Sequence, residues 1–359
     1  MTDRIPVSEI ETPALLIDMD ALEYNIRIMS EYIKRTRAEL RPHFMTYKCP
    51  RITYMQQGAG AKGATCATVG EAEALAAAGI GDILIANQIV EQSKLLRVAE
   101  LAKNGARISI LTDNAVNVWD IAAAAITFRT EIRVLVELDV GMGRCGVASP
   151  EAALDLAEQI GKTPGLVFDG IQAYEGHLSH IPDEAARRAG VRLMTEKVRE
   201  TVRLLRANGV DVNTVSGAGT GTYNITAEEG LWTEIQAGSY VFMDAGYGKL
   251  GLGFRQSLTV LATVIHKRPG FAVTDAGTKA CGVDQGPPVI KRHPEIAVVL
   301  NEEHGKLADA GNKLRYRQKV EYVPGHCFTT VNLYDAYYCV RDGVLEDIWP
   351  IVGRYKSMR

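Results

Sequence analysis

The 359-residue sequence lacks the features that mark several large classes of protein. It has no apolar run of about 18 residues, and it opens on Met-Thr-Asp-Arg-Ile-Pro without the apolar core of a signal peptide, so we expect a cytoplasmic protein with no membrane partner. Its 40 basic and 43 acidic side chains leave a net charge of −3, which offers no basic surface for nucleic acid. The six cysteines form no Cys-x-x-Cys pair, which favours reduced thiols over a disulfide framework or a structural zinc site.

Between residues 39 and 240, short apolar segments alternate regularly with amphipathic helical patterns. The pattern predicts strands at 39–47, 63–68, 82–87, 107–112, 131–139, 168–174, 212–216 and 233–240. It predicts helices at 20–38, 51–60, 70–79, 91–103, 114–125, 150–161 and 183–208. Eight apolar strands with intervening helices favour an α/β fold with a parallel (β/α)8 barrel of the TIM type, and a doubly wound open sheet is the alternative.

After residue 250 the long helical period disappears, and short strands follow one another between Gly, Pro and Asn turns. The strands predicted there are 257–266, 271–275, 295–300, 320–322 and 337–341. We expect a C-terminal all-β domain, and we expect the opening strand, 14–18, to pair with it. The predicted organisation is therefore a barrel over 19–248 and a β domain made of 1–18 and 249–359.

The glycine-rich turn, residues 216–222, follows the seventh predicted barrel strand. It consists of Ser216, Gly217, Ala218, Gly219, Thr220, Gly221 and Thr222. Glycines let backbone N–H groups converge on an anion, and the two threonine hydroxyls are further donors. No lysine follows as in a P-loop, and the spacing is not that of a dinucleotide site. Because a TIM barrel commonly binds phosphate after strands seven and eight, we predict that this turn holds a phosphate.

Other polar side chains lie near the predicted carboxyl ends of the strands, where the active site of a barrel is built. They are His43, Arg144, Tyr174, His177, Tyr240 and Asp244. An arginine, tyrosines and histidines beside a phosphate-binding turn are typical of a site for an anionic aromatic cofactor.

The sequence resembles the family of D-threonine aldolase, D-serine dehydratase and 3-hydroxy-D-aspartate aldolase, which have the alanine-racemase-like architecture of a barrel that binds pyridoxal phosphate (PLP) and a β domain. The motifs that carry this resemblance span 12–18, 41–43, 70–73, 139–147, 170–174, 216–223, 238–244, 275–277, 283–284 and 324–326. The resemblance implies that the glycine-rich turn, Gly238, Ser239 and Tyr240 hold the cofactor phosphate. It also implies that Arg144 and Tyr174 lie against the cofactor or substrate, and that the chain forms a homodimer.

Three positions depart from the family pattern. The family carries Arg-Pro-His-x-Lys-x-His-Lys, whose first lysine forms a Schiff base with PLP, whereas Met45 and Tyr47 stand here at the lysine and histidine positions. A thioether cannot form an imine, so PLP at this site is expected to be held noncovalently at most. In the β domain, Phe328 replaces the second metal ligand, which leaves His326 as a single ligand and makes a bound divalent metal doubtful. Cys327 should point away if the segment is extended.

The sequence leaves several alternatives open. Lys48, Lys249 and Lys279 are candidates to replace the missing amine, although Lys48 lies at an odd offset that would place it on the opposite face of a strand. The predicted function is that of a lyase that cleaves or dehydrates a β-hydroxy amino acid or a related β-hydroxy carbonyl compound. Its candidate bases are His43, Tyr174 and His177. The alternatives are a PLP-independent enzyme that reuses the anion pocket and a non-catalytic binding protein.

Overall fold

The computed structural model describes residues 5–356, and these divide into two compact units. The strand-rich unit takes the residues up to Ile28 together with Thr46–Arg51 and Ser239–Arg354, and the barrel unit takes Met29–Met45, Ile52–Gly238 and the residues after Arg354. No helix of the described chain combines the length and the apolar character needed to cross a membrane. All six cysteines are free thiols, as the sequence pattern indicated.

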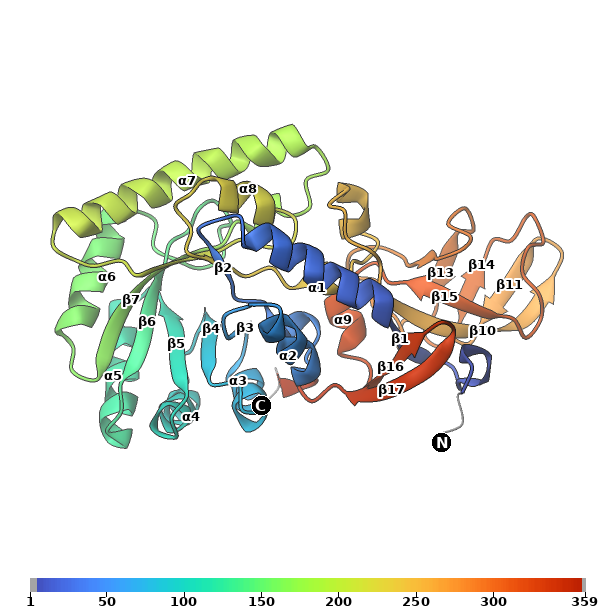
Figure 1. Cartoon of the computed structure of the whole chain (residues 1–359), viewed down its shortest axis with the longest axis horizontal. Helices are drawn as coiled ribbons and strands as arrows, with labels where there is room; N and C mark the ends of the chain where they lie inside the picture. Colours follow the sequence, from blue (N-terminus) through green and yellow to red (C-terminus); the bar gives the residue numbers. More distant parts are fainter. Residues whose placement is uncertain (1–4, 357–359) are drawn as a thin grey trace. The chain divides into compact units, whose positions relative to one another are not determined.

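The barrel unit is built on a parallel sheet of eight strands, which confirms the predicted fold class (Figure 1). The strands are β2 (Glu39–Leu40), β3 (Ala64–Cys66), β4 (Asp82–Gln88), β5 (Arg107–Thr112), β6 (Ile132–Glu137), β7 (Leu166–Ala173), β8 (Thr214–Gly217) and β9 (Glu234–Ile235). They pair in chain order from β3 to β9, and β9 pairs with β2. The Thr65 N–H donates to Pro42 O at 2.9 Å and the Lys62 N–H to Leu40 O at 2.7 Å, which joins the first strand to the second.

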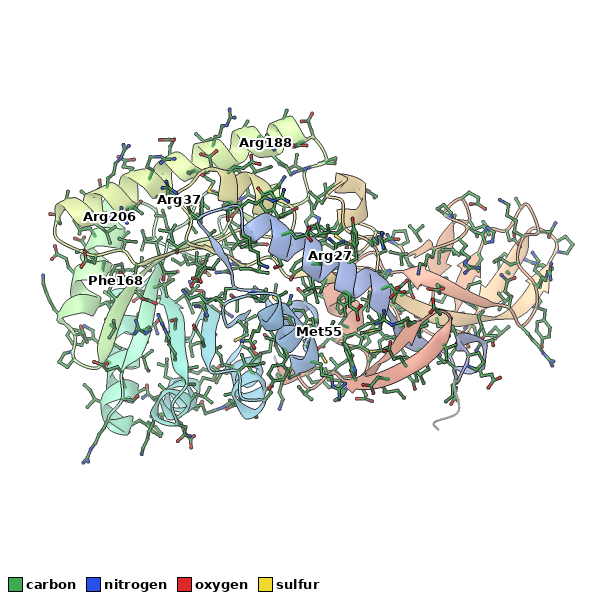
Figure 2. All side chains as sticks on the ribbon, viewed as in Figure 1. Arg27, Arg37, Met55, Phe168, Arg188 and Arg206 are labelled. Carbon is green, nitrogen blue, oxygen red and sulfur yellow. The ribbon has the colours of Figure 1, made fainter. Side chains whose placement is uncertain are left out.

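Helices precede or connect these strands, and the periodicity predicted all of them except the short one at 223–228. They are α1 (Met19–Ile33), α2 (Pro50–Gly58), α3 (Val69–Ala77), α4 (Gln92–Lys103), α5 (Ala115–Phe128), α6 (Pro150–Lys162), α7 (Glu184–Ala207) and α8 (Tyr223–Glu228). The predicted start of α6 is confirmed, because Ser149 Oγ accepts the Ala152 N–H and Pro150 takes the first helical position. Two arginines, Arg188 and Arg206, lie near the opposite ends of α7, the longest of these helices (Figure 2).

The strand-rich unit contains β1 and the strands that follow the barrel. Its elements are β1 (Ala14–Asp18), β10 (Leu258–Arg268), β11 (Phe271–Thr274), β12 (Val289–Ile290), β13 (Val298–Leu300), β14 (Gly305–Leu307), β15 (Lys319–Val323), α9 (Cys327–Val331), β16 (Ala336–Arg341) and β17 (Val344–Pro350). Strand β1 lies between β10, to which it is antiparallel, and β16, to which it is parallel. The predicted pairing of the opening strand with the C-terminal sheet is therefore confirmed.

The first and last barrel strands are much shorter than predicted. Strand β2 ends at Leu40, and Phe44–Thr46 form a 3-10 turn instead of continuing the strand to residue 47. Pro42 lacks the N–H group that a central strand would use in the sheet. The segment predicted as a strand at 233–240 keeps only Glu234–Ile235, and Ser239–Val241 form a second 3-10 turn.

A buried ion network lies where the first and last barrel strands meet. Arg41 donates to both oxygens of Glu234, at 3.0 and 2.9 Å, and also to Asp82 Oδ1 at 2.7 Å. Lys62 Nζ lies 3.1 Å from Glu234 Oε1. The side chains of Arg41 and Glu234 are only 5% and 2% exposed, so these charges are compensated by each other rather than by water.

Candidate active site

The glycine-rich turn begins at the carboxyl end of β8, the seventh barrel strand, as predicted. A Cβ atom at Gly217 would lie 2.1 Å from Ala173 O, and one at Gly221 would lie 1.9 Å from Ser179 O. Ala218 has a left-handed φ of 63°. The close packing leaves space only for glycine at these two positions, and it holds the backbone of the turn in one shape.

Tyr174 and Gly219 lie against each other, just beyond the ends of the neighbouring strands β7 and β8. A Cβ atom at Gly219 would be 3.5 Å from the Tyr174 ring and 3.1 Å from Ser179 Oγ. The Gly221 N–H has no acceptor in the described part of the chain, so it is a donor available to an anion. Thr220 is also buried in this turn.

Sequence reasoning missed Glu175, which lies completely buried beside the same turn. One carboxyl oxygen accepts the Thr222 hydroxyl at 2.6 Å and the Thr226 hydroxyl at 2.9 Å, and the other accepts the Ala218 N–H at 3.2 Å. Burial raises the pKa of Glu175, and these hydrogen bonds oppose the rise only in part. Because the Thr222 hydroxyl donates its hydrogen bond to Glu175, its oxygen acts as an acceptor toward the turn and accepts the Gly219 N–H at 3.3 Å.

Arg144 is carried by a second loop, residues 139–147, at the end of β6. Asp139 Oδ1 accepts the N–H groups of Gly141 and Gly143 at 3.0 and 3.1 Å, and Lys197 Nζ donates to Asp139 O at 2.7 Å. The guanidinium of Arg144 lies over the Tyr174 ring, 5.7 Å from its centroid. The structure therefore brings together Arg144, Tyr174 and the glycine-rich turn, three features that the sequence placed on different strands.

Glu137 is a second buried carboxyl group that the sequence did not single out as a site residue. Gln88 Nε2 donates to it, and Arg144 forms an ion pair with it at 3.6 Å. Burial raises the pKa of Glu137, while Gln88 and Arg144 act in the opposite direction. Gln88 also lines a cavity of about 310 Å³ at the ends of β3 and β4, on the same face of the barrel. The sequence did contain a signal for Glu137, because a glutamate at the last position of a barrel strand lies on the face where active sites are built.

Amide side chains complete the mouth of the barrel next to the turn. Gln236 Nε2 donates to Gln172 Oε1 at 2.6 Å and to Ser216 Oγ at 2.8 Å, and all three side chains are buried. Ser216 is thereby tied to the ends of neighbouring strands, and it points into the barrel.

The two candidate histidines occupy different parts of the barrel unit. His43 is half-buried after β2 and forms a backbone bridge with Thr65. His177 is exposed in η3 (Gly176–Leu178), and its Nε2 would lie 3.3 Å from a Cβ atom at Gly141 of the Arg144 loop. His177 is therefore the histidine that the structure places against the loop that carries Arg144.

Met45 occupies the centre of the 3-10 turn after β2 and is half-buried. The expected strand offset between Met45 and Lys48 was wrong, because the segment turns at Phe44 instead of remaining extended. Lys48 is buried with a left-handed φ of 50°, and its carbonyl accepts the Gly353 N–H at 2.9 Å. Of the other candidate lysines, Lys249 is exposed and Lys279 pairs with Glu303 at the surface.

The remaining predicted residues belong to the end of the barrel unit and to the strand-rich unit. Gly238 closes the barrel unit, whereas Ser239 and Tyr240 are buried in η4 (Ser239–Val241) of the strand-rich unit. The Tyr240 ring packs on Phe254 with centroids 5.5 Å apart. Asp244 Oδ2 accepts the Cys327 N–H at 3.1 Å.

His326 precedes helix α9, so the expectation of an extended segment with Cys327 on its far side was wrong. His326 Nδ1 lies 2.6 Å from Asp284 Oδ2, and Thr329 donates to Asp284 Oδ1 at 2.6 Å. Burial alone would raise the pKa of Asp284, but hydrogen bonds from Thr329 and His326 hold it below its ordinary value. Among the described residues, no three His, Cys, Asp or Glu side chains converge in a metal-binding arrangement.

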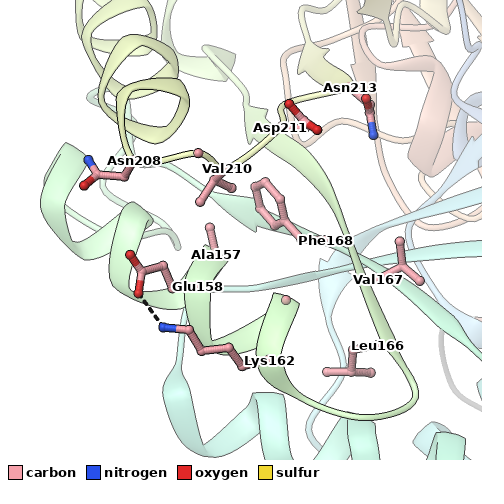
Figure 3. A pocket seen from close by; sticks show the side chains of 12 residues that line it. Ala157, Glu158, Lys162, Leu166, Val167, Phe168, Asn208, Val210, Asp211 and Asn213 are labelled. Carbon is pink, nitrogen blue, oxygen red and sulfur yellow. Dashed lines mark hydrogen bonds and ion pairs between the residues drawn. The ribbon is translucent and has the colours of Figure 1, made fainter.

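A larger cleft, of about 610 Å³, opens at the amino-terminal ends of β7 and β8 (Figure 3). It is lined by the end of α6, the start of β7 and the loop 208–213, and it includes the ion pair between Lys162 and Glu158. Barrel enzymes carry their chemistry at the opposite, carboxyl-terminal face. The cleft therefore lies apart from the candidate active site despite its size.

The barrel, the C-terminal sheet and the mouth residues define a protein of the alanine racemase fold. Residues 17–246 match the alanine racemase N-terminal domain, and residues 257–340 match the putative serine dehydratase domain. The chain belongs to the family of lyases that contains D-threonine aldolase and 3-hydroxy-D-aspartate aldolase, whose members use PLP.

Three relatives illustrate this membership. The chain is 40% identical to a D-threonine aldolase of Arthrobacter sp., over 97% of this chain and 94% of the relative. It is 38% identical to a 3-hydroxy-D-aspartate aldolase of Paracoccus denitrificans, over 98% and 94% of the two chains. The crystal structure of D-threonine aldolase from Filomicrobium marinum superposes with a TM-score of 0.95, at 35% identity, and covers 98% of each chain.

Proposed function

We propose that this protein is a lyase that cleaves a β-hydroxy-D-amino acid into an aldehyde and glycine. The observation that carries the proposal is the contact series from Arg144 through Tyr174 to Gly219 on the carboxyl-terminal face of the barrel. This series joins a cation, an aromatic ring and an anion-binding turn in one place. Relatives that are 35–40% identical are named aldolases, whereas a D-threo-3-hydroxyaspartate dehydratase of Delftia sp. is only 29% identical, and this difference favours cleavage over dehydration.

The residues of this site fit a phosphate-bearing aromatic cofactor. The glycine-rich turn has a donor in the Gly221 N–H, and side chains larger than hydrogen are excluded at Gly217 and Gly221. We assign the phosphate of PLP to this turn and its ring to the neighbourhood of Tyr174 and Arg144. Since Met45 supplies no amine, we propose that PLP is bound noncovalently.

The reaction requires one proton to leave the β-hydroxyl and one to arrive at Cα. A base removes the hydroxyl proton, the Cα–Cβ bond breaks to form the aldehyde carbonyl, and the electron pair of that bond passes to Cα, which is then protonated to give glycine. Bound PLP supplies the electron sink that makes this electron pair stable. Burial raises the pKa of Tyr174, which makes its phenol a poor base near neutral pH, so His177 and His43 are the favoured bases.

The proposal is tested by incubating the chain with D-threonine or 3-hydroxy-D-aspartate, with and without added PLP, and measuring aldehyde and glycine. We expect PLP-dependent formation of both products in equal amounts. Arg144→Met should lower kcat/KM by about ten- to a hundredfold, the effect of removing a hydrogen bond to a charged group. Asp211→Asn, in the cleft at the opposite face, is the matched control and should leave kcat/KM unchanged. Absence of both products at every PLP concentration would contradict the proposal.

A second candidate function is favoured by Met45 and Phe328 together, because both replace groups that family chemistry uses. In this alternative the pocket binds a different anion and either catalyses a PLP-independent reaction or only binds the ligand. Equilibrium dialysis distinguishes this alternative from the lyase proposal, because a chain that retains inorganic phosphate but no PLP supports the alternative.

A further inference from the structure

We propose that Glu175 is the positioning residue of the glycine-rich turn, and that its hydrogen bonds hold the turn in the shape that binds a phosphate. This inference rests on the proposed function, because it concerns the turn assigned there to the phosphate of PLP. It names a residue outside the predicted site and gives it a role in affinity rather than in the chemical step.

Glu175 makes three hydrogen bonds, two to the turn and one to helix α8. Its carboxyl group bonds the Ala218 N–H at the left-handed residue, the Thr222 hydroxyl at the end of the turn and the Thr226 hydroxyl one helical turn later. Thr222 then accepts the Gly219 N–H. These bonds occupy the N–H groups of Ala218 and Gly219 on the Glu175 side and leave the Gly221 N–H available. The hydrogen bonds of Glu175 therefore determine which N–H groups of the turn remain available to bind an anion.

The charge of Glu175 has no compensating cation. The ion pairs of the described residues do not include it, and its surroundings are hydroxyl and backbone groups. The phenol of Tyr174 is the titratable group that interacts with it directly. On the elements packed against it, His177 of η3 is exposed and Glu228 of α8 pairs with Arg188 at the surface. An ionised Glu175 would repel an anion bound at the turn, whereas protonation removes that repulsion while the carbonyl oxygen still accepts hydrogen bonds.

The test measures ligand affinity rather than catalysis. PLP, pyridoxal and inorganic phosphate are each titrated against the unaltered chain, Glu175→Ala and Glu175→Gln by equilibrium dialysis. For Glu175→Ala we expect the affinity for PLP to fall by at least about tenfold and the affinity for pyridoxal, which has no phosphate, to stay unchanged. Glu175→Gln, which mimics the neutral acid, should bind PLP as tightly as the unaltered chain does at low pH.

The pH dependence separates positioning from a general loss of folding. The affinity of the unaltered chain for PLP should fall as the pH rises through the raised pKa of Glu175, and the Glu175→Gln variant should lack this component. Glu71→Gln is the matched control, since Glu71 is a buried glutamate of the same unit that instead accepts the Ala67 N–H at 2.8 Å. It should bind all three ligands like the unaltered chain.

Each outcome either supports or overturns the inference. Equal affinities of Glu175→Ala and the unaltered chain for PLP, or equal losses for PLP and pyridoxal, overturn it even if the lyase activity is present. A chain that binds inorganic phosphate in a Glu175-dependent way but does not bind PLP refutes the lyase proposal alone. A chain that binds neither refutes both. If Glu175→Ala does not fold, Thr226→Val takes its place. We then expect a several-fold lower affinity for PLP and an unchanged affinity for pyridoxal. An equal fall in affinity for both ligands overturns the inference.

Discussion

Position 45 is a methionine in this chain, where the family pattern given by the resemblance carries a lysine. Methionine and lysine have side chains of similar length, but only the amine can bond the aldehyde of PLP. Met45 lies in a 3-10 turn at the end of the first barrel strand, so the backbone there is formed without the lysine. Under the proposal, this one substitution changes how PLP is retained and leaves the glycine-rich turn as the group that holds the phosphate.

The substitution Met45→Lys should restore covalent retention of PLP. We expect a visible absorption band that survives dialysis and is abolished by borohydride reduction, together with a faster cleavage of D-threonine than in the unaltered chain. The unaltered chain, treated identically, is the control and should lose its absorption on dialysis. A band that survives dialysis in both proteins would mean that another lysine, such as Lys48, already bonds the cofactor.

The association of strand β2 with β3 and β9 depends on buried charges as well as on backbone hydrogen bonds. The first and last strands are only two residues long, so they contribute few bonds to the sheet. Arg41 compensates for this by joining Glu234 of β9 to Asp82 at the start of β4. Such a buried network favours one strand arrangement, since a shifted register would leave charges unpaired in a dry environment.

Removing Arg41 should therefore destabilise the barrel unit strongly. We expect Arg41→Met to lower the free energy of unfolding by about 3–5 kcal/mol, because the carboxylate of Glu234 would remain buried without its main partner. Lys162→Met, which breaks an exposed ion pair with Glu158, should cost only about 0–1 kcal/mol. Urea unfolding of the two variants measures the difference, and similar values for both would contradict a structural role for the buried network.

The same network predicts the direction of the pH dependence. Burial alone would raise the pKa of Glu234, but Arg41 and Lys62 hold it below its ordinary value. A lowered pKa means that the stabilisation is complete above the unfolded pKa of about 4.3 and is lost as the pH falls through the folded pKa. Unfolding measured from neutral to acidic pH should show this loss in the unaltered chain and a smaller one in Glu234→Gln.

For the molecule as a whole, the family architecture is present, and we propose that the cofactor is held without a covalent bond. Both matched domains are present, and the predicted division at 19–248 remains a proposal, as does the homodimer that the resemblance implied. A cofactor held only by noncovalent contacts exchanges between the bound state and free solution. Its contribution to the free energy of unfolding then depends on its free concentration.

Added PLP should stabilise the folded chain reversibly. At a concentration a hundred times its Kd, a ligand that binds only the folded state raises the free energy of unfolding by about 2.7 kcal/mol. We expect a higher Tm in the presence of PLP, its return to the starting value after dialysis, and a partial reversal by excess inorganic phosphate. A Tm that stays elevated after exhaustive dialysis would contradict noncovalent binding.

The fold class, the order of the barrel strands, the place of the glycine-rich turn after the seventh strand and the absence of an amine at position 45 were all predictable from the amino-acid sequence. These features depend on local periodicity, on chain order and on residue identity, which are all visible in one dimension. The folded chain was needed to show that residues 44–46 turn and that His326 precedes a helix. It was also needed to show that Glu137 is buried beside Arg144 and Glu175 beside the glycine-rich turn. Burial and hydrogen bonding of a carboxyl group depend on what other segments bring to it, and the sequence around Glu175 contains no sign of Thr222 or Thr226 lying against it.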